Sequence, residues 1–413
     1  MPKRRVVVTG LGCITPLGNS VNELWPSLLS GKSGVSNITH FDASAMTVKF
    51  SASIKNFDSE KYFDSKEKRK YDLFMQYGLA AGIDAINDSN LLNTDFDHNR
   101  IGVSIGSGIG GLPSIEQTHN TYIKSGPRRI SPFFVPATII NMISGNLSIK
   151  YGFKGPNLSI VTACTTGTHN IGEGFRQIQY SHADVMICGG AEMAASPLGI
   201  GGFAAARALS TRNENPEKAS RPWDIDRDGF VLGDGAGVLV LEELEHAKQR
   251  GANIYGEIIG YGMSADAFHM TLPSEDGDGA KRCMSNAIND AEINPEDVGY
   301  INAHGTSTPA GDIVEVRAIK SLFGEHSKNL IINSTKSMIG HLLGAAGGVE
   351  ALVTVLSLKN QKIHPTINVD NQDPECDLDF NAKSSKEVNI NIALSNSFGF
   401  GGTNGSLIFS KYD

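Results

Sequence analysis

The chain has 413 residues, 40% of them hydrophobic and 19% charged, which is enough to bury a large core in one large or two fused globular units. Its formal net charge of -8 disfavours nucleic acid as the main partner, and no stretch approaches the roughly 18 to 20 apolar residues that a membrane span needs. Five cysteines without a C-x-x-C pair favour a reducing cytoplasm over a disulfide framework or a zinc ribbon.

The first segment, MPKRRVVVTGLGCITPLGN, begins basic and then becomes apolar, as a secretory signal peptide does. Gly10, Gly12 and Pro16 interrupt the apolar part, so we expect a first strand that runs into a loop. Short β-rich runs recur along the chain, with helical stretches such as 71–89 and 348–360 between some of them. We predict strands at residues 4–10, 100–106, 158–163, 183–190 and 236–242, and then at 254–262, 298–305, 329–335, 391–397 and 405–410.

This alternation of strands and helices predicts an α/β architecture of layered sheets and helices. A helix that ends at Gly251 separates two series of strands, so we divide the chain into an N-terminal half, residues 1–251, and a C-terminal half, residues 252–413. Each half carries a strand, a turn of small residues and a helix, which is consistent with an internal duplication. Residues 36–70 and 113–140 have the character of insertions made of loops and polar helices.

Two glycine-rich motifs suggest chemistry that their context does not support. GSGIGG, residues 106–111, matches a dinucleotide fingerprint, but Pro113 follows closely and no acidic residue stands about 20 positions further on. GVSIG, residues 102–106, matches the nucleophile motif of serine hydrolases, but Ser104 lies inside the predicted strand and not at a strand-to-helix turn. We therefore disfavour both a dinucleotide site and a serine hydrolase.

Cys164, in IVTACTTGTHNIG, stands where a strand-like run passes into a helical pattern. At a helix N-terminus the backbone N–H groups and the helix dipole favour thiolate, which lowers the pKa of a cysteine and makes it a nucleophile. From this stretch alone, Cys164 could equally be a cysteine packed in the core. We interpret Cys188 as such a core cysteine. His304 and His341 favour an assembled site, because each follows a strand directly in a turn of small residues.

Four segments together resemble the β-ketoacyl synthases of fatty acid synthesis, which act on thioesters of an acyl carrier protein (ACP) and belong to the thiolase-like superfamily. The segments are TACTTG (162–167), NAHGTSTPAGD (302–312), KSMIGHLLGAAG (336–347) and NSFGFGGTN (396–404), and they match in order and in spacing. The resemblance covers essentially the whole chain. It implies a five-layered αβαβα fold of two similar halves, a homodimer, and an active site between the halves.

The resemblance also implies an elongating enzyme that condenses acyl-ACP with malonyl-ACP and lengthens the acyl chain by two carbons. Cys164 would hold the acyl group as a thioester. His304 and His341 would stabilise the enolate that forms when malonyl-ACP loses carbon dioxide. The backbone N–H groups of Cys164 and Phe400 would form the oxyanion hole for the condensation step.

Further site residues follow from the same resemblance. Lys336, with Glu350, would organise the two histidines, and Phe400 between glycines would act as a gate for the acyl chain. Ile109 and Phe203 would form the floor of the acyl pocket, in the pattern of the type II branch that accepts long chains. The other implied substrate contacts are Thr306 and Thr308, which bind the pantetheine arm, together with Phe398 and Gly399.

No organic cofactor is implied beyond the phosphopantetheine arm of ACP. Some relatives hold a monovalent cation, Na+ or K+, beside the site, and the corresponding residues here are Asn302, Ala303, Glu350, Ser395 and Asn396. Because ACPs are strongly acidic, docking onto this acidic chain needs a local basic patch. The residues implied for that patch are Lys66, Arg69, Lys70, Arg128, Arg129 and Arg207.

Two alternative functions stay open at this point. A polyketide-type ketosynthase shares the Cys-His-His site. A non-catalytic chain-length factor shares the fold, although it is expected to lack the nucleophile, and Cys164 is present.

Overall fold

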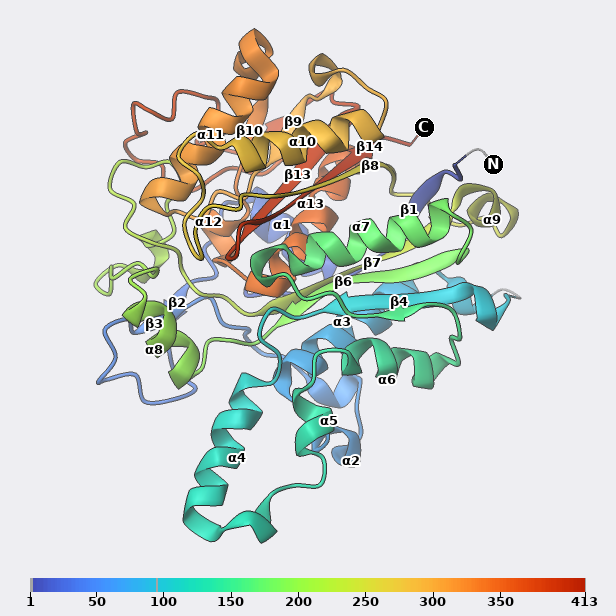
Figure 1. Ribbon diagram of the computed structural model, residues 1–413, viewed down its shortest axis with the longest axis vertical. Coiled ribbons are helices and arrows are strands. Elements are labelled where there is room, and N and C mark those ends of the chain that lie inside the picture. The colour runs from blue at the N-terminus through green and yellow to red at the C-terminus, as the bar shows by residue number, and fades with distance from the viewer. Residues whose placement is uncertain (1–2, 94–95, 413) are drawn as a thin grey trace.

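The computed structural model describes residues 3–93 and 96–412, and in these residues ten strands form one continuous mixed sheet (Figure 1). The N-terminal half supplies β1 (Val6–Ile14), β4 (Ile101–Gly106), β5 (Asn157–Leu158), β6 (Val185–Glu192) and β7 (Gly235–Glu243). The C-terminal half supplies β8 (Gly256–Ala265), β9 (Tyr300–Asn302), β10 (Ile331–Asn333), β13 (Ile392–Gly399) and β14 (Thr403–Ser410). Two small sheets pair β2 (Ser36–Asn37) with β3 (Phe50–Ser51) and β11 (Lys362–Ile363) with β12 (Lys386–Glu387).

The two halves of this sheet repeat one strand order. The N-terminal half runs β5-β4-β6-β7-β1 and the C-terminal half runs β10-β9-β13-β14-β8. In each, the third strand is parallel to the second and antiparallel to the fourth. The halves join where β1 pairs with β8, with Val6 opposite Ile258. This repetition confirms the prediction of two similar halves.

The two halves of the sheet form two layers, and with three layers of helices they make the predicted five. The central layer consists of α7 (Thr166–Gln179) and α13 (Ala346–Asn360), which pack on each other and on strands of both halves. The outer face of the N-terminal strands is covered by α3 (Leu73–Asp88) and α6 (Met142–Tyr151). The outer layer of the C-terminal half contains α10 (Asp278–Asp290), which packs on β8 and β14, with α11 (Pro309–Phe323) beside it.

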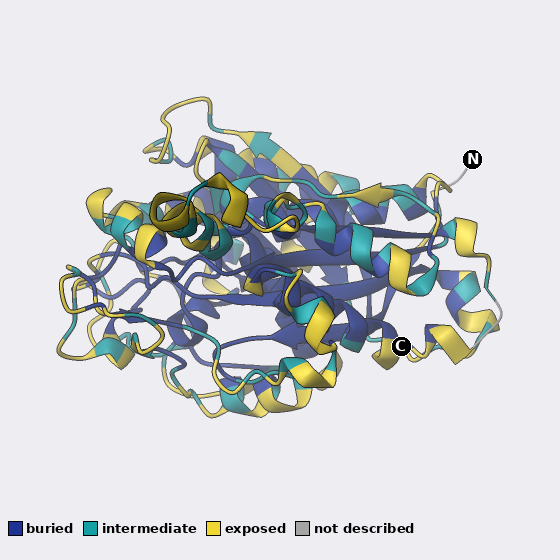
Figure 2. Cartoon of the chain, turned by 90° about the horizontal axis from the view of Figure 1, so that it is seen from below, coloured by how far each residue is buried: buried dark blue, intermediate teal, exposed yellow. Residues whose placement is uncertain are grey.

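Both faces of the strands are therefore buried, which explains why the strand sequences are continuously apolar instead of alternating. In β6, Met186 and Cys188 contact the central core, whereas Val185 and Ile187 contact the outer core under α3. Figure 2 shows the same distribution, with buried strands inside and exposed residues on the outer helices and loops.

The remaining helices and turns lie around these layers. The helices are α1 (Val21–Leu29), α2 (Ser65–Lys68), α4 (Leu112–Ser125), α5 (Phe134–Thr138), α8 (Pro197–Ala205), α9 (Leu244–Gln249) and α12 (Lys336–Ile339). Short 3-10 turns are η1 (Ser59–Lys61), η2 (Leu91–Asn93), η3 (His98–Arg100), η4 (Pro127–Arg129), η5 (Ala163–Thr165), η6 (Pro216–Lys218), η7 (Pro295–Asp297), η8 (Gly324–Lys328) and η9 (Leu343–Ala345). Figure 1 shows α4, η4 and α5 projecting from the layers, in the segment predicted as an insertion.

One predicted strand, residues 158–163, is wrong over most of its length. Only Leu158 belongs to a strand, and the residues from 159 to 162 have no regular structure. Their polar groups bind the start of α7 instead: Ile160 N–H donates to Asn170 Oδ1 at 3.1 Å, and Thr162 N–H donates to Thr166 Oγ1 at 2.9 Å. Side chains of the helix thus satisfy backbone groups that a strand would pair with a neighbour.

None of the helices in the described ranges combines the length and the apolar character that a membrane crossing requires.

Candidate active site

A cavity of about 530 Å³ opens where loops from both halves of the chain meet. Its wall contains most of the residues predicted to act on substrate. They are Ile109, Cys164, Phe203, Arg207, His304, Thr306, Thr308, His341, Phe398, Gly399 and Phe400. The fold therefore brings together side chains that lie almost 300 positions apart in the chain, from 109 to 400.

Cys164 lies in the turn η5, which begins the central helix α7. Ala163 before it has a left-handed φ of 50°, a strained value for a residue with a side chain. Thr165 after it donates its hydroxyl to the Thr403 carbonyl at 2.9 Å and so ties the turn to the C-terminal half. The thiol is thus held in a fixed position at the helix N-terminus.

Burial raises the pKa of the Cys164 thiol to about 11. The nearby backbone N–H of Phe400 and the positive charge of Lys336 both oppose this rise. The prediction of a lowered pKa is therefore wrong. The buried sulfur loses more hydration of its thiolate form than the helix terminus and these two contacts restore.

His304 and His341 lie side by side on the cavity wall in edge-to-face contact, with ring centroids 5.3 Å apart and planes at 87°. Nδ1 of each ring is buried without a hydrogen-bond partner among the described residues, so Nε2 is the nitrogen that a bound substrate can reach. Burial and the Lys336 charge hold the pKa of both histidines well below its ordinary value. Both rings are therefore neutral near pH 7, and each can donate one N–H.

Backbone contacts fix the two histidines. His304 follows β9, and its N–H donates to Glu315 Oε1 at 2.9 Å while the next N–H, that of Gly305, donates to Oε2 at 2.8 Å. His341 follows α12, and its N–H donates to the Val231 carbonyl at 2.7 Å. Each histidine thus lies on a segment that a neighbouring element holds in place.

Lys336 and Glu350 lie behind the histidines and form a buried ion pair between α12 and α13. Burial raises the pKa of Glu350 to about 7, and the attraction of Lys336 opposes the rise. The pair lies outside the cavity wall, so its effect on the site is electrostatic: the lysine charge lowers the pKa of Cys164, His304 and His341 alike.

The residues predicted for a monovalent cation lie close to this pair, but their side chains do not all face one side. Ser395 on β13 is opposite Asn302 on β9, and Ser395 Oγ and Glu350 Oε2 are buried without hydrogen-bond partners among the described residues. Asn396, next along the strand, faces away and hydrogen-bonds to Glu315 and Ser406. The free oxygens of Ser395 and Glu350 are suitable ligands for a hard cation, whereas Asn396 could contribute only its backbone carbonyl.

Thr306 and Thr308 lie on the loop between β9 and α11, where their hydroxyls share a hydrogen bond of 3.0 Å. Ser307 between them has a left-handed φ of 70°. Its N–H donates to Asp312 Oδ1 at 3.1 Å, and its carbonyl accepts from Gly229 N–H at 3.1 Å. These contacts to the middle residue leave both threonines on the cavity wall.

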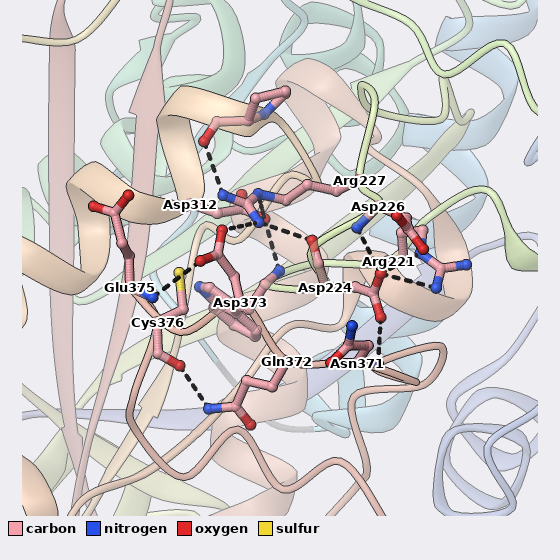
Figure 3. A network of polar contacts seen from close by, with 12 residues as sticks. Arg221, Asp224, Asp226, Arg227, Asp312, Asn371, Gln372, Asp373, Glu375 and Cys376 are labelled. Carbon is pink, nitrogen blue, oxygen red and sulfur yellow. Dashed lines mark hydrogen bonds and ion pairs between the residues drawn. The ribbon is translucent and has the colours of Figure 1, made fainter.

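A buried polar network, drawn in Figure 3, anchors this loop. Arg227 donates to the carbonyls of Thr308 at 3.2 Å and Pro309 at 3.0 Å and to Asp373 Oδ2 at 2.8 Å. Asp312 lies 3.7 Å from the same guanidinium. Segments near residues 227, 310 and 373 are thereby joined beside the cavity.

Ile109 and Phe203 come from the N-terminal half, Ile109 from the loop after β4 and Phe203 from α8. The ring of Phe203 lies 5.4 Å from that of Phe230 and 6.4 Å from that of Phe400. An apolar corner is thus placed close to the residue predicted as a gate.

The two glycine-rich motifs do not form the sites that they formally match. Ser104 is buried in β4 and donates to Asn170 Oδ1 at 2.8 Å. The N–H groups of Gly108 and Ile109 donate to the Glu192 carboxylate at 2.7 and 3.1 Å. The hydroxyl is therefore engaged inside the core, and the amides that would bind a phosphate already have an acceptor.

Sequence reasoning missed three buried charged residues that support the site: Glu192, Arg227 and Glu315. Glu192 stands among apolar and small residues in VMICGGAEMA, and an isolated acid in such a context is a usable signal. Glu315 has Asp312 and Arg317 close by in the segment GDIVEVRAI, so its signal is weaker. Arg227 stands in the polar segment RPWDIDRDG, which resembles a surface loop and offers no such signal.

The residues predicted to dock ACP are exposed but do not all lie together. Lys66 is in α2, Arg69 and Lys70 follow it, and the Lys70 ammonium lies 5.5 Å from the centre of the Phe133 ring near α5. Arg207 belongs to the cavity wall. The other two, Arg128 and Arg129, are in η4 on the projecting segment.

Comparison with known proteins identifies the family. The model of the β-ketoacyl synthase N-terminal domain matches residues 3–247, and that of the C-terminal domain matches residues 255–370. The 3-oxoacyl-[acyl-carrier-protein] synthase 2 of Vibrio harveyi is 58% identical over 412 residues, covering 100% of this chain and 99% of that protein. The enzyme of the same name from Coxiella burnetii is 57% identical over 411 residues, with coverage of 100% and 99%.

A solved structure supports the same assignment. It is a type II polyketide acyl-carrier protein in complex with its ketosynthase, and the matched chain has a TM-score of 0.92, 38% identity and full coverage of both chains. The ketosynthase, thiolase-like fold is thereby shown. The chain therefore belongs to the β-ketoacyl synthase family and is an acyltransferase of the 3-oxoacyl-[acyl-carrier-protein] synthase 2 type.

Proposed function

We propose that this chain condenses acyl-ACP with malonyl-ACP to 3-oxoacyl-ACP and so elongates fatty acids by two carbons, with Cys164 as nucleophile. The observation that carries the proposal is a single cavity that holds one thiol and two neutral histidines. The full-length identity to enzymes named 3-oxoacyl-[acyl-carrier-protein] synthase 2 supports the same substrates.

The first step is acyl transfer. The Cys164 sulfur attacks the thioester carbon of acyl-ACP, the bond to the pantetheine sulfur breaks, and the thiol proton passes to the departing pantetheine. Negative charge gathers on the former carbonyl oxygen. The N–H groups of Cys164 and Phe400 can stabilise that charge by hydrogen bonding, because the Phe400 amide already lies near the sulfur.

The second step is decarboxylation and condensation. The bond between the malonyl carboxylate and its α-carbon breaks, carbon dioxide leaves, and the electron pair forms an enolate. The Nε2–H groups of His304 and His341 donate hydrogen bonds to the enolate oxygen. Neutral rings suit this role because they donate a hydrogen bond without transferring the proton to the enolate. The α-carbon then attacks the acyl thioester, and Cys164 leaves and regains a proton from solvent.

The acyl chain enters the apolar corner formed by Ile109 and Phe203, and Phe400 acts as its gate. Phe400 is partly exposed and is followed by Gly401 and Gly402, which have φ values of 85° and 70° and contribute no side chain to hinder its movement. Thr306 and Thr308 bind the pantetheine arm, with Phe398 and Gly399 beside it on the same wall. Structures of free and acylated enzyme with an identical Phe400 rotamer would contradict the gate.

One assay tests the reaction. The purified protein is incubated with acyl-ACP of defined length and malonyl-ACP, and the products are examined by mass spectrometry. We expect a 3-oxoacyl-ACP two carbons longer. A polyketide-type ketosynthase would extend the product repeatedly without reduction, and a chain-length factor would form no acyl-enzyme.

We infer a monovalent cation site beside the reaction centre, formed by the carboxylate of Glu350, the hydroxyl of Ser395, the amide of Asn302 and the backbones of Ala303 and Asn396. The unpartnered oxygens of Ser395 and Glu350 support it. A bound cation would add positive charge beside the Lys336–Glu350 pair. Melting the protein in K+, Na+ and a bulky organic cation tests the site, because only a fitting ion raises the melting temperature.

Two proposals concern the assembly of the chain. We propose a homodimer, because β5 is an edge strand of the sheet and exposed apolar residues occur on it and in the segments before and after it. These residues are Val135, Ile139, Ile149, Leu158 and Val161.

We also propose that the halves divide after residue 251, in the connection between β7 and β8. Sedimentation velocity tests the dimer, and separate expression of the halves tests the boundary.

We also propose that ACP docks against the exposed cations Lys66, Arg69, Lys70, Arg128, Arg129 and Arg207, which lie on three separate segments, and that the enzyme works in a reducing cytoplasm. Exposure of all six cations supports their role in docking. The five cysteines are free and buried, which supports the location.

A further inference from the structure

Glu192, the last residue of β6, is fully buried, and four donors converge on its carboxylate. Ser107 Oγ donates to Oε1 at 2.7 Å and Ile109 N–H donates to the same oxygen at 3.1 Å. Gly108 N–H donates to Oε2 at 2.7 Å and Gly344 N–H donates to it at 3.0 Å. One carboxylate thus joins two loops that are more than 230 positions apart in the chain.

This arrangement favours an ionised carboxylate. Three of the four partners are backbone N–H groups, which can only donate, and the Ser107 hydroxyl donates to Oε1 while it accepts from Gly110 N–H at 3.0 Å. A protonated Glu192 could donate its own O–H only to the Ser107 oxygen. Burial raises the pKa of Glu192 and the four hydrogen bonds oppose the rise. No ion pair with Glu192 occurs in the part of the chain that the structure describes.

The two loops joined by Glu192 belong to the candidate site. One carries Ile109, the predicted pocket floor, and the other is η9, which follows His341. They touch so closely that a Cβ on Gly344 would lie 2.3 Å from Gly108 N, and a Cβ on Gly108 would lie 2.7 Å from Glu192 Oε2. The position of Ile109 relative to His341 is therefore set through this contact.

The carboxylate is also close enough to act on the nucleophile. Its negative charge is one of the causes that raise the pKa of the Cys164 thiol. Burying a charged side chain costs more stability than burying an apolar residue of similar size. The Glu192 carboxylate has no cationic partner among the described residues and lies beside the proposed reaction centre, so its burial calls for a functional explanation.

We propose that Glu192 is a positioning residue for chain-length selectivity, which fixes Ile109 as the floor of the acyl pocket by accepting hydrogen bonds from the Ile109 loop and from the turn after His341. The inference rests on the proposed acyl pocket. Binding of an acyl chain that is long enough to reach Ile109 depends on the position of the floor. Binding of a shorter chain, which ends before Ile109, does not depend on it.

The test compares acylation of Cys164 by acyl-ACPs with 8 and with 16 carbons, measured as covalent acyl-enzyme by mass spectrometry. Glu192→Gln keeps the size of the side chain but places an NH2 group against backbone N–H groups. We expect the rate with the long chain to fall about tenfold more than the rate with the short chain. Ser107→Ala removes one donor and leaves the charge, so we expect the same direction with a smaller ratio.

A second measurement reports the charge itself. We expect the pH midpoint for alkylation of the free Cys164 thiol by iodoacetamide to be lower in Glu192→Gln, because the raising charge is gone, and unchanged in Ser107→Ala. A merely structural role would lower both acylation rates equally. An unchanged midpoint in Glu192→Gln would overturn the ionised carboxylate on which the inference depends.

Ile109→Phe separates this inference from the pocket itself, because a larger floor should exclude the long chain directly. If Ile109→Phe changes the ratio of the two rates and neither Glu192→Gln nor Ser107→Ala does, the pocket stands and the role of Glu192 is overturned. If none of the three changes the ratio, the pocket lies elsewhere and the inference falls with it. Ser107→Ala also decides the question if Glu192→Gln fails to fold.

Discussion

The two turns that begin the central helices have the same backbone and different chemistry. In the N-terminal half, η5 has a φ of 50° at Ala163 and leads into α7. In the C-terminal half, η9 has a φ of 47° at Leu343 and leads into α13. The second residue of the turn is Cys164 in one and Gly344 in the other. Each half thus builds the same support, and one side chain decides whether it carries a thiol, which is the proposed nucleophile.

The strands that end beside these turns differ in a corresponding way. β6 ends at Glu192, whose carboxylate accepts from the Gly344 N–H of the other half. β13 ends at Gly399, directly before Phe400, whose N–H contacts the Cys164 sulfur of the other half. In the proposed mechanism, a repeated backbone is therefore used once for a reaction and once for a structural tie.

The largest effect is expected from Cys164→Ala, which removes the reactive side chain and makes the two turns chemically alike. We expect condensation to fall at least about 1,000-fold and the acyl-enzyme to disappear, because no other side chain of the cavity is placed to carry the acyl group. Mass spectrometry after incubation with acyl-ACP measures this. The control is Cys188→Ala, which removes a buried thiol of β6 and should still be acylated. An acylated Cys164→Ala protein would contradict the mechanism.

The next effect concerns the histidines of the C-terminal half. His304→Ala and His341→Ala should each slow decarboxylation of malonyl-ACP about 100- to 1,000-fold, since each removes one donor to the enolate oxygen. Acylation of Cys164 should fall far less. Release of carbon dioxide and formation of acyl-enzyme are measured separately, with the exposed His98→Ala as control. Equal losses in both half-reactions would show that the histidines have another role.

The third prediction follows the pKa of the thiol. Because burial raises the pKa of Cys164 to about 11, the free thiol is protonated at neutral pH and its thiolate fraction grows with pH. We expect alkylation by iodoacetamide to accelerate about tenfold per pH unit between about pH 7 and 10. Rates are followed by the mass of the modified peptide. A plateau already near pH 8 would show that the helix N-terminus dominates over burial.

The fourth prediction tests the contact between the two central helices. Gly167 and Gly347 occupy matching positions, and an added Cβ would lie 2.5 Å from Gly348 N in the first case and 2.1 Å from Thr168 Oγ1 in the second. We expect Gly167→Ala and Gly347→Ala each to lower the free energy of unfolding by about 1–3 kcal/mol, measured in urea. Gly201→Ala, where the added Cβ meets nothing within 4 Å, is the matched control. Unchanged stability would show that the halves can separate slightly.

The smallest effect is expected at the surface of the N-terminal half. Arg69→Glu with Lys70→Glu should raise the KM for acyl-ACP several-fold and reduce its dependence on ionic strength, because charges at the rim of an interface act mainly on encounter. Turnover of a small acyl-pantetheine thioester should not change. Steady-state kinetics at two salt concentrations measure both. Equal losses with both substrates would indicate a damaged fold, and no loss with either would place ACP elsewhere.

Much of the site was predictable because its residues stand in short segments with unusual local sequence. Cys164, His304, His341 and Phe400 were assigned from such segments, and the structure places all four on one cavity wall. The strand predicted at 158–163 was wrong because side chains of α7 satisfy its backbone, and the apolar pattern of this segment does not report the side chains of the helix that follows it. Arg227 was missed because buried and exposed polar segments have the same composition.

The sequence by itself determined the class of fold, the two halves and the chemical types at the reaction centre, because these depend on local periodicity and on segments whose residues are adjacent in the chain. Only the tertiary structure decided the electrostatics. Whether a thiol near a helix N-terminus has a lowered or a raised pKa depends on how much water the fold removes from it, and here burial dominates. The tie through Glu192 was likewise decided in three dimensions, since its donors come from both halves.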